Sequence, residues 1–188
     1  MKTMTDERST ALSGARPRER ADFDTFVAAR STALLRLAYL LTRDHALAED
    51  LLQTTYAKAF TAWRRLRASD DPVAYVHRIL INTFLSERRL RRSGEISLAE
   101  MPEPDRRSES MSSSDDVAER LVLTAALAEL PPLDRAVVVQ RYWLDRSLAT
   151  TAADLGLSEA AVKNRSSRAL RRLRELLTDD LTLPRRTP

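Results

Sequence analysis

The side chains best suited to a specific chemistry in this 188-residue sequence are basic and amide groups between residues 163 and 174. The segment holds one lysine and five arginines, and its apolar residues fall on the opposite face if it is helical, at roughly 100° per residue. Lysine, arginine and asparagine pair with base edges in the major groove of DNA, and arginine also holds phosphates. The predicted base-edge contacts are Lys163, Asn164, Ser167 and Arg168, and the predicted phosphate contacts are Arg165, Arg171 and Arg172.

A second set of polar groups surrounds the apolar stripe of residues 72–92. It combines aromatic rings that can stack on bases, an amide that can read a base edge and arginines that can hold the backbone. These are the groups that bind an unpaired DNA strand. His77, taken alone, is more typical of a surface histidine than of a base contact. The candidates for DNA contact here are Tyr75, Arg78, Asn82, Ser86, Arg88 and Arg89.

The composition excludes several kinds of reaction centre. With no cysteine and only His45 and His77, the chain can build neither a thiolate zinc site nor a multi-histidine metal centre. Three glycines leave no place for a glycine-rich phosphate loop. Glu49 and Asp50 are neighbouring acids, but no nucleophile or metal ligand accompanies them. We therefore expect a protein that is not an enzyme and that needs no cofactor.

The sequence gives no sign of membrane insertion. No uncharged apolar stretch approaches the roughly 18 residues that a membrane span needs. The first twenty residues are polar and contain no hydrophobic signal core. We therefore expect a cytoplasmic protein.

Apolar residues spaced by three and four predict an all-α chain. The expected helices run from Asp22 to Thr42, from Asp44 to Trp63, and from the capping pair Asp71-Pro72 to Gly94. A further helix ends at Pro131 and Pro132. The next element, Leu133 to Trp143, contains three consecutive valines that would also suit a buried strand, but no partner strand is visible, which favours a helix.

Composition divides this helical chain into two small domains. Residues 93–115 are rich in serine, proline and acids, with too few large apolar side chains to form a core, and predict a flexible acidic linker. The expected organisation is a disordered tail (1–20), a first domain (21–92), the linker (93–115), a second domain (116–178) and a C-terminal tail (179–188). The net charge of +4 therefore conceals two basic segments separated by an acidic one.

Residues 148–167 have the spacing of a helix-turn-helix. Ala152 is small where two helices would cross, and Gly156 can adopt the left-handed conformation that ends the first helix. Ser158 can cap the next helix, and Leu157 and Val162 would point into the core. The pattern favours DNA binding over an ordinary helical hairpin, because a basic face follows it.

At this point the sequence resembles the extracytoplasmic-function (ECF) sigma factors of bacterial RNA polymerase, near the actinobacterial SigE-like subgroup. Residues 130–174 are similar to region 4 of that family, which reads the −35 promoter element. Residues 48–63 resemble region 2.2, and residues 72–92 resemble the region that opens and reads the −10 element. The second and third blocks are features that a one-domain regulator has no reason to carry.

The resemblance implies partners as well as sites. Core RNA polymerase (its β′ clamp and β subunits) and promoter DNA are the expected partners, and an anti-sigma factor is the usual silencer in the family. It also places Asn82 and the loop of residues 64–71 at the −10 strand, although Ser86 stands where many members carry aspartate. The implied contacts with the β′ clamp helices are Asp50, Leu51, Gln53 and Thr54. The alternative function is that of a stand-alone helix-turn-helix transcriptional regulator whose N-terminal helices dimerise or sense a signal.

Overall fold

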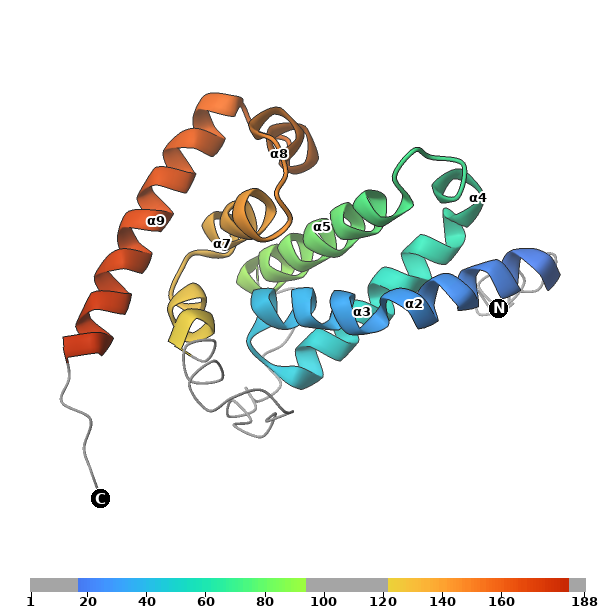
Figure 1. Cartoon of the computed structure of the whole chain (residues 1–188), viewed down its shortest axis with the longest axis horizontal. Helices are drawn as coiled ribbons and strands as arrows, with labels where there is room; N and C mark the ends of the chain where they lie inside the picture. Colours follow the sequence, from blue (N-terminus) through green and yellow to red (C-terminus); the bar gives the residue numbers. More distant parts are fainter. Residues whose placement is uncertain (1–16, 94–121, 183–188) are drawn as a thin grey trace, which may run out of the picture.

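The computed structural model of the chain describes residues 17–93 and 122–182, and every regular element within them is helical (Figure 1). The all-α prediction is therefore confirmed for this part of the chain. The N-terminal half contains α2 (Pro17–Thr42), α3 (His45–Thr61), α4 (Trp63–Leu66) and α5 (Pro72–Ser93). The C-terminal half begins with helical residues 122–128 and continues through α7 (Pro132–Val138), the π-helical turn η1 (Val139–Trp143), α8 (Leu148–Leu155) and α9 (Glu159–Thr182).

The predicted helix starts are confirmed where an acid caps them. The Asp44 carboxylate accepts a hydrogen bond from the Leu47 amide at 2.8 Å, and α3 begins at the next residue. Asp71 accepts one from the Ala74 amide at 2.8 Å, with Pro72 in the first position of α5. These bonds satisfy amide groups that a helix N-terminus otherwise leaves unpaired.

Three predicted boundaries differ from the structure. The first helix starts at Pro17 rather than near Asp22, because a proline suits the first helical position and Glu19 in the first turn pairs with Arg64 at 3.5 Å. The second ends at Thr61, and Trp63 opens the short α4 instead of closing α3. The last helix continues to Thr182, into residues expected to form a tail. Most of the expected linker lies outside the described residues.

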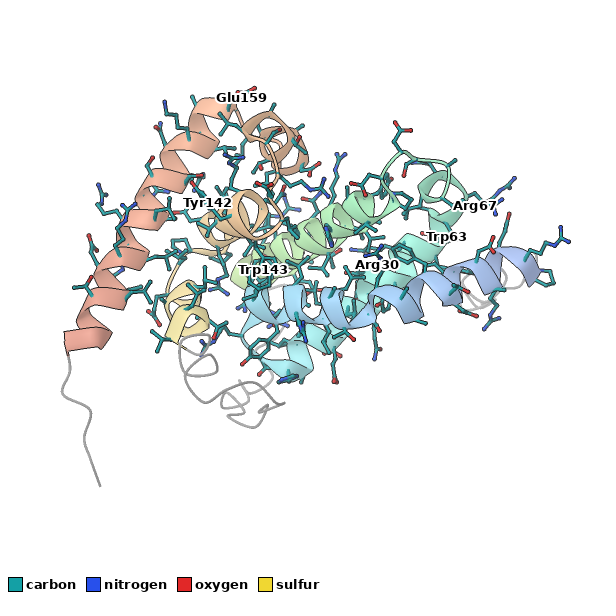
Figure 2. All side chains as sticks on the ribbon, viewed as in Figure 1. Arg30, Trp63, Arg67, Tyr142, Trp143 and Glu159 are labelled. Atoms are coloured by element: carbon teal, nitrogen blue, oxygen red, sulfur yellow. The ribbon has the colours of Figure 1, made fainter. Side chains whose placement is uncertain are left out.

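Aromatic rings join the first helices of the N-terminal half. The Phe23 ring meets those of Phe60 and Trp63 edge to face, each at 5.1 Å between centroids. The Trp63 ring, labelled in Figure 2, also lies 5.3 Å from that of Phe26 in α2, which fixes the end of the α3–α4 segment against that helix. Leucines of α2, α3 and α5 make up much of the rest of this core, together with Val76, Ile81 and Phe84 of α5.

The three consecutive valines are helical, and each contributes to a different part of the core. Val137 packs with Ala152 and Val162, Val138 packs against α9, and Val139 packs in the N-terminal core. A helix advances about 100° per residue, so neighbouring side chains point to different partners. The valines are consecutive because this helix is enclosed on several sides. It lies between α9 and α5 (Figure 1).

The two halves pack against each other. Arg135 of α7 is buried, and its guanidinium donates hydrogen bonds to the carbonyl of Leu41 in α2 and to those of Ala128 and Leu130. Burial and neighbouring arginines lower the pKa of Arg135 to about 10, so it remains a cation at neutral pH. Leu40 of α2 in turn lies in the core of the C-terminal half. Composition predicted two domains but not this contact between them.

Candidate nucleic-acid interface

The helix-turn-helix is built as its spacing predicts. Gly156 has φ +64°, and the next amide returns to the Ala152 carbonyl at 2.9 Å, which closes the C-terminal end of α8. The Ser158 hydroxyl accepts a hydrogen bond from the Ala161 amide at 3.2 Å at the start of α9. Val162 is fully buried against Ala152. Together these contacts fix the direction in which α9 leaves the turn, beside α8, where Figure 2 labels Glu159.

The outer face of α9 presents the predicted polar groups to solvent. Lys163, Asn164, Ser167 and Arg171 are exposed, and their positions fall within an arc of about 100° on the helix. Val162, Ala169 and Leu173 are buried on the other side. The face has the chemical groups of a helix that enters the major groove.

Arg165 and Arg168 lie at the edge of this face and share one carboxylate. Asp134, in the first turn of α7, is buried to 2% exposure. Its Oδ1 accepts from Arg165 Nη1 at 2.6 Å, and its Oδ2 accepts from Arg168 Nε at 3.2 Å and Nη2 at 2.8 Å. Sequence reasoning missed Asp134, because nothing in the order of residues relates position 134 to positions 165 and 168.

Five of the six residues predicted for the −10 strand share one face of α5. At about 100° per residue their positions fall within an arc of about 80°. These residues are Tyr75, Arg78, Asn82, Ser86 and Arg89. Arg88 stands apart from these five, because its position turns away from this arc and its guanidinium lies 5.6 Å from the Phe84 ring centroid.

The C-terminal half contacts the first part of that α5 face. Arg78 pairs with Asp154 of α8 at 3.5 Å, and Asp71, the α5 cap, pairs with Arg146 at 3.4 Å. Tyr75 is partly buried, as are Leu144 and Leu155 of the C-terminal half, and all three pack against the N-terminal core. Asp154 and Arg146 are therefore further residues of the site region that the sequence did not indicate.

His77 lies beside this contact and is less exposed than the sequence suggested. Burial, together with the nearby Arg146, lowers the pKa of His77 to about 4. The Asp71 carboxylate opposes this change but is the smaller influence. The imidazole is therefore neutral at pH 7. The pKa of Asp71 is itself lowered, mainly by the hydrogen bond from the Ala74 amide.

The α3 residues expected to contact the polymerase divide into surface and core. Asp50 and Gln53 are exposed and Thr54 is half-buried, on one edge of the helix. Leu51 is fully buried in the N-terminal core, so the expectation that its side chain meets a partner is wrong for this structure. Its apolar side chain instead holds α3 in place. Glu87 of α5 lies close enough to Asp50 for the two acids to interact, and burial raises the pKa of Glu87.

Within residues 17–93 and 122–182, no helix is both long and apolar enough to cross a membrane. The same described residues contain no group of three potential metal ligands from histidine, cysteine, aspartate and glutamate.

Comparisons with known proteins match both halves of the chain. The family profile Sigma-70 region 2 matches residues 26–94, and Sigma-70, region 4 matches residues 126–175. The RNA polymerase sigma-E factor of Streptomyces coelicolor is 38% identical over 156 residues, which cover 83% of this chain and 86% of that protein. The ECF RNA polymerase sigma factor SigL of Mycobacterium tuberculosis is 32% identical over 177 residues, with 89% and 96% covered.

Solved structures show the same likeness. The sigma factor RpoE in complex with the anti-sigma factor NepR, from Bartonella quintana, superposes with a TM-score of 0.60 at 26% identity, over 84% of this chain and 97% of that one. CnrH in complex with the cytosolic domain of CnrY gives a TM-score of 0.56 at 26% identity, over 92% and 95%.

The fold and the two polar faces define a class of protein: a helical transcription factor in two parts, with a DNA-binding helix-turn-helix in its C-terminal half. The chain belongs to the sigma-70 family of RNA polymerase sigma factors, and its relatives place it with the ECF sigma factors. A stand-alone regulator would not carry the region 2 match over residues 26–94.

Proposed function

We propose that this chain is a promoter-specificity subunit that binds core RNA polymerase through α3 and reads promoter DNA with α5 and α9. The observation that carries the proposal is the pairing, on one chain, of a region 2 match with a helix-turn-helix whose α9 exposes a basic and amide face. The proposed role requires no reaction centre or cofactor in the chain, because RNA synthesis belongs to the polymerase.

The proposed polymerase contact is the outer edge of α3. Asp50 and Gln53 offer charged and amide groups to solvent, and Thr54 lies beside them. Leu51 supports this edge from inside the core. A polar surface on a rigid, well-packed helix suits a partner that must bind and later be released. By similarity to the family, the partner surface is the β′ clamp.

The proposed DNA contacts are bipartite. The α5 face formed by Tyr75, Arg78, Asn82, Ser86 and Arg89, with the preceding loop, would take the −10 strand. The α9 face would take the −35 duplex. Because the C-terminal half contacts the start of the α5 face, full access to the partly buried Tyr75 requires the halves to shift there, and Arg78 must release Asp154 to bind a phosphate.

An anti-sigma factor is the further partner that the comparisons support. RpoE of Bartonella quintana was solved in complex with NepR, which is named there as an anti-sigma factor, and CnrH was solved in complex with the cytosolic domain of CnrY. We infer the same class of partner for this chain.

The experiment that tests the proposed function is co-purification with core RNA polymerase in the absence of DNA. A stable complex that Asp50→Ala weakens, with the variant still folded, is the expected result. Free chain that binds DNA but never associates with the core enzyme would instead identify a stand-alone regulator.

A further inference from the structure

A polar cluster joins α7 to α9 through Asp134, a residue outside the predicted contacts, which holds two arginines that are among them. Its carboxylate, 3% exposed, accepts hydrogen bonds from two arginines of α9. A carboxylate this deeply buried needs such partners, because its desolvation would otherwise be costly. Two cations on one anion leave the cluster with a net positive charge at the edge of the exposed α9 face.

The two arginines are held differently. Arg168 is bound by Nε and Nη2, the side edge of its guanidinium, and Nη2 also lies 3.1 Å from Oδ1. Its Nη1 has no partner within the described part of the chain, and its side chain is 57% exposed. Arg165 donates Nη1 to the carboxylate and is 31% exposed. The planar fork lets Arg168 remain fixed on one edge and offer another.

We propose that Asp134 is a positioning residue for promoter reading, which fixes Arg168 so that the edge carrying Nη1 meets a guanine in the −35 duplex. The inference rests on the proposed function of α9. Guanine O6 and N7 accept two hydrogen bonds from a guanidinium edge. An arginine already ordered by Asp134 loses less side-chain freedom on binding than a free one, which sharpens discrimination between base pairs.

The competing interpretation is that Asp134 only braces α7 against α9. A brace would affect binding to every DNA sequence equally, through the amount of folded protein. A positioning residue has a different signature. Asp134→Asn keeps the shape but removes the charge that restrains both arginines. Discrimination should then fall, while binding to unrelated DNA is retained or strengthened because the freed cations reach phosphates.

The test uses the full chain bound to core RNA polymerase. The probes are a −35 duplex selected by the wild-type complex from a randomised pool, its single-base-pair variants and a scrambled duplex, each titrated at several salt concentrations. Asp145→Asn is the matched control. It makes the same change of charge in the same half, at an exposed position with φ +49° that asparagine accepts.

We expect Asp134→Asn to lose roughly 5- to 150-fold of discrimination at one guanine position, the range of a bidentate base contact. Binding to the scrambled duplex should not weaken, and Asp145→Asn should discriminate like the wild type. Adding Asp134→Asn to Arg168→Ala should cause no further loss at that position. Unchanged discrimination in a folded Asp134→Asn complex would overturn the proposal.

Arg168→Lys keeps the test decisive if Asp134→Asn does not fold. Lysine retains a cation beside Asp134 but has no second edge to offer a base. Loss of discrimination shows that the guanidinium reads a base, as the proposal requires, and full retention shows a phosphate contact and overturns the proposal. Failure of the underlying function would look different, because the wild-type complex itself would then select no common −35 sequence.

Discussion

Gly156 is the residue on which the geometry of the helix-turn-helix depends most directly, and its replacement has a calculable cost. Its φ of +64° is left-handed, and a Cβ built at this position meets nothing within 4 Å. The effect of Gly156→Ala is therefore backbone strain alone, without a steric clash. Strain of this kind costs roughly 1–2 kcal/mol for an L-residue.

The net change is smaller than the strain, because alanine also restricts the unfolded chain. That restriction favours the variant by about 0.4–1 kcal/mol. We expect Gly156→Ala to lower the free energy of unfolding by about 1 kcal/mol, which corresponds to a melting temperature about 2–4 °C lower for a chain of this size. Gly156→Asn should cost less, because asparagine tolerates the left-handed region.

Urea unfolding of the three proteins, followed by circular dichroism, measures these differences. The expected order of stability is glycine, then asparagine, then alanine, with an unchanged dependence on urea. An alanine variant as stable as the wild type would contradict the left-handed turn. A loss above about 3 kcal/mol would instead show that the methyl group meets neighbours, against the open space seen here.

Three other predictions concern acid stability, polymerase binding and the contact between the halves. The pKa of His77 falls from 6.5 to about 4 on folding. Its contribution to the free energy of unfolding is therefore complete above about pH 6.5 and is lost as the pH falls towards 4. Stability measured by urea unfolding should depend less on pH between 6.5 and 4 in His77→Gln than in the wild type. Asp50→Ala should reduce co-purification with core polymerase at least about tenfold, the effect of roughly 1.4 kcal/mol, and leave the melting temperature unchanged. The control Asp24→Ala, which removes an exposed acid of α2, should change neither the co-purification nor the melting temperature. Since the chain has no cysteine, fluorophores on cysteines introduced at exposed Ala28 of α2 and Ala153 of α8, outside the proposed contacts, report one distance between the halves. This distance should change when polymerase and promoter bind, and an unchanged distance would contradict a shift of the halves.

Local chemistry explains why the helices and the turn could be predicted. Asp44, Asp71 and Ser158 cap helices with their own side chains, and Gly156 ends one with its own backbone, so each signal lies within a few residues of its effect. The spacing of apolar residues by three and four likewise predicted that Val162 lies in the core, where it is fully buried.

Contacts between distant segments could not be predicted in the same way. The sequence shows an acid at position 134 and arginines at 165 and 168, but only the packing of α7 on α9 brings them within 2.6–3.2 Å. The burial of Leu51 also depends on distant segments, because the side chains that cover it belong to α2 and α5. The contact between the two halves depends on Arg135, which binds backbone carbonyl groups. Every residue carries such a group, so the sequence does not reveal which ones Arg135 will bind.

The central claim is that this chain gives core RNA polymerase its choice of promoter. Transcripts made from a genomic or randomised template by core polymerase, with and without the purified chain, test it most directly when their 5′ ends are mapped. We expect new start sites that share two upstream sequence elements at a fixed spacing. Identical start sites with and without the chain would contradict it.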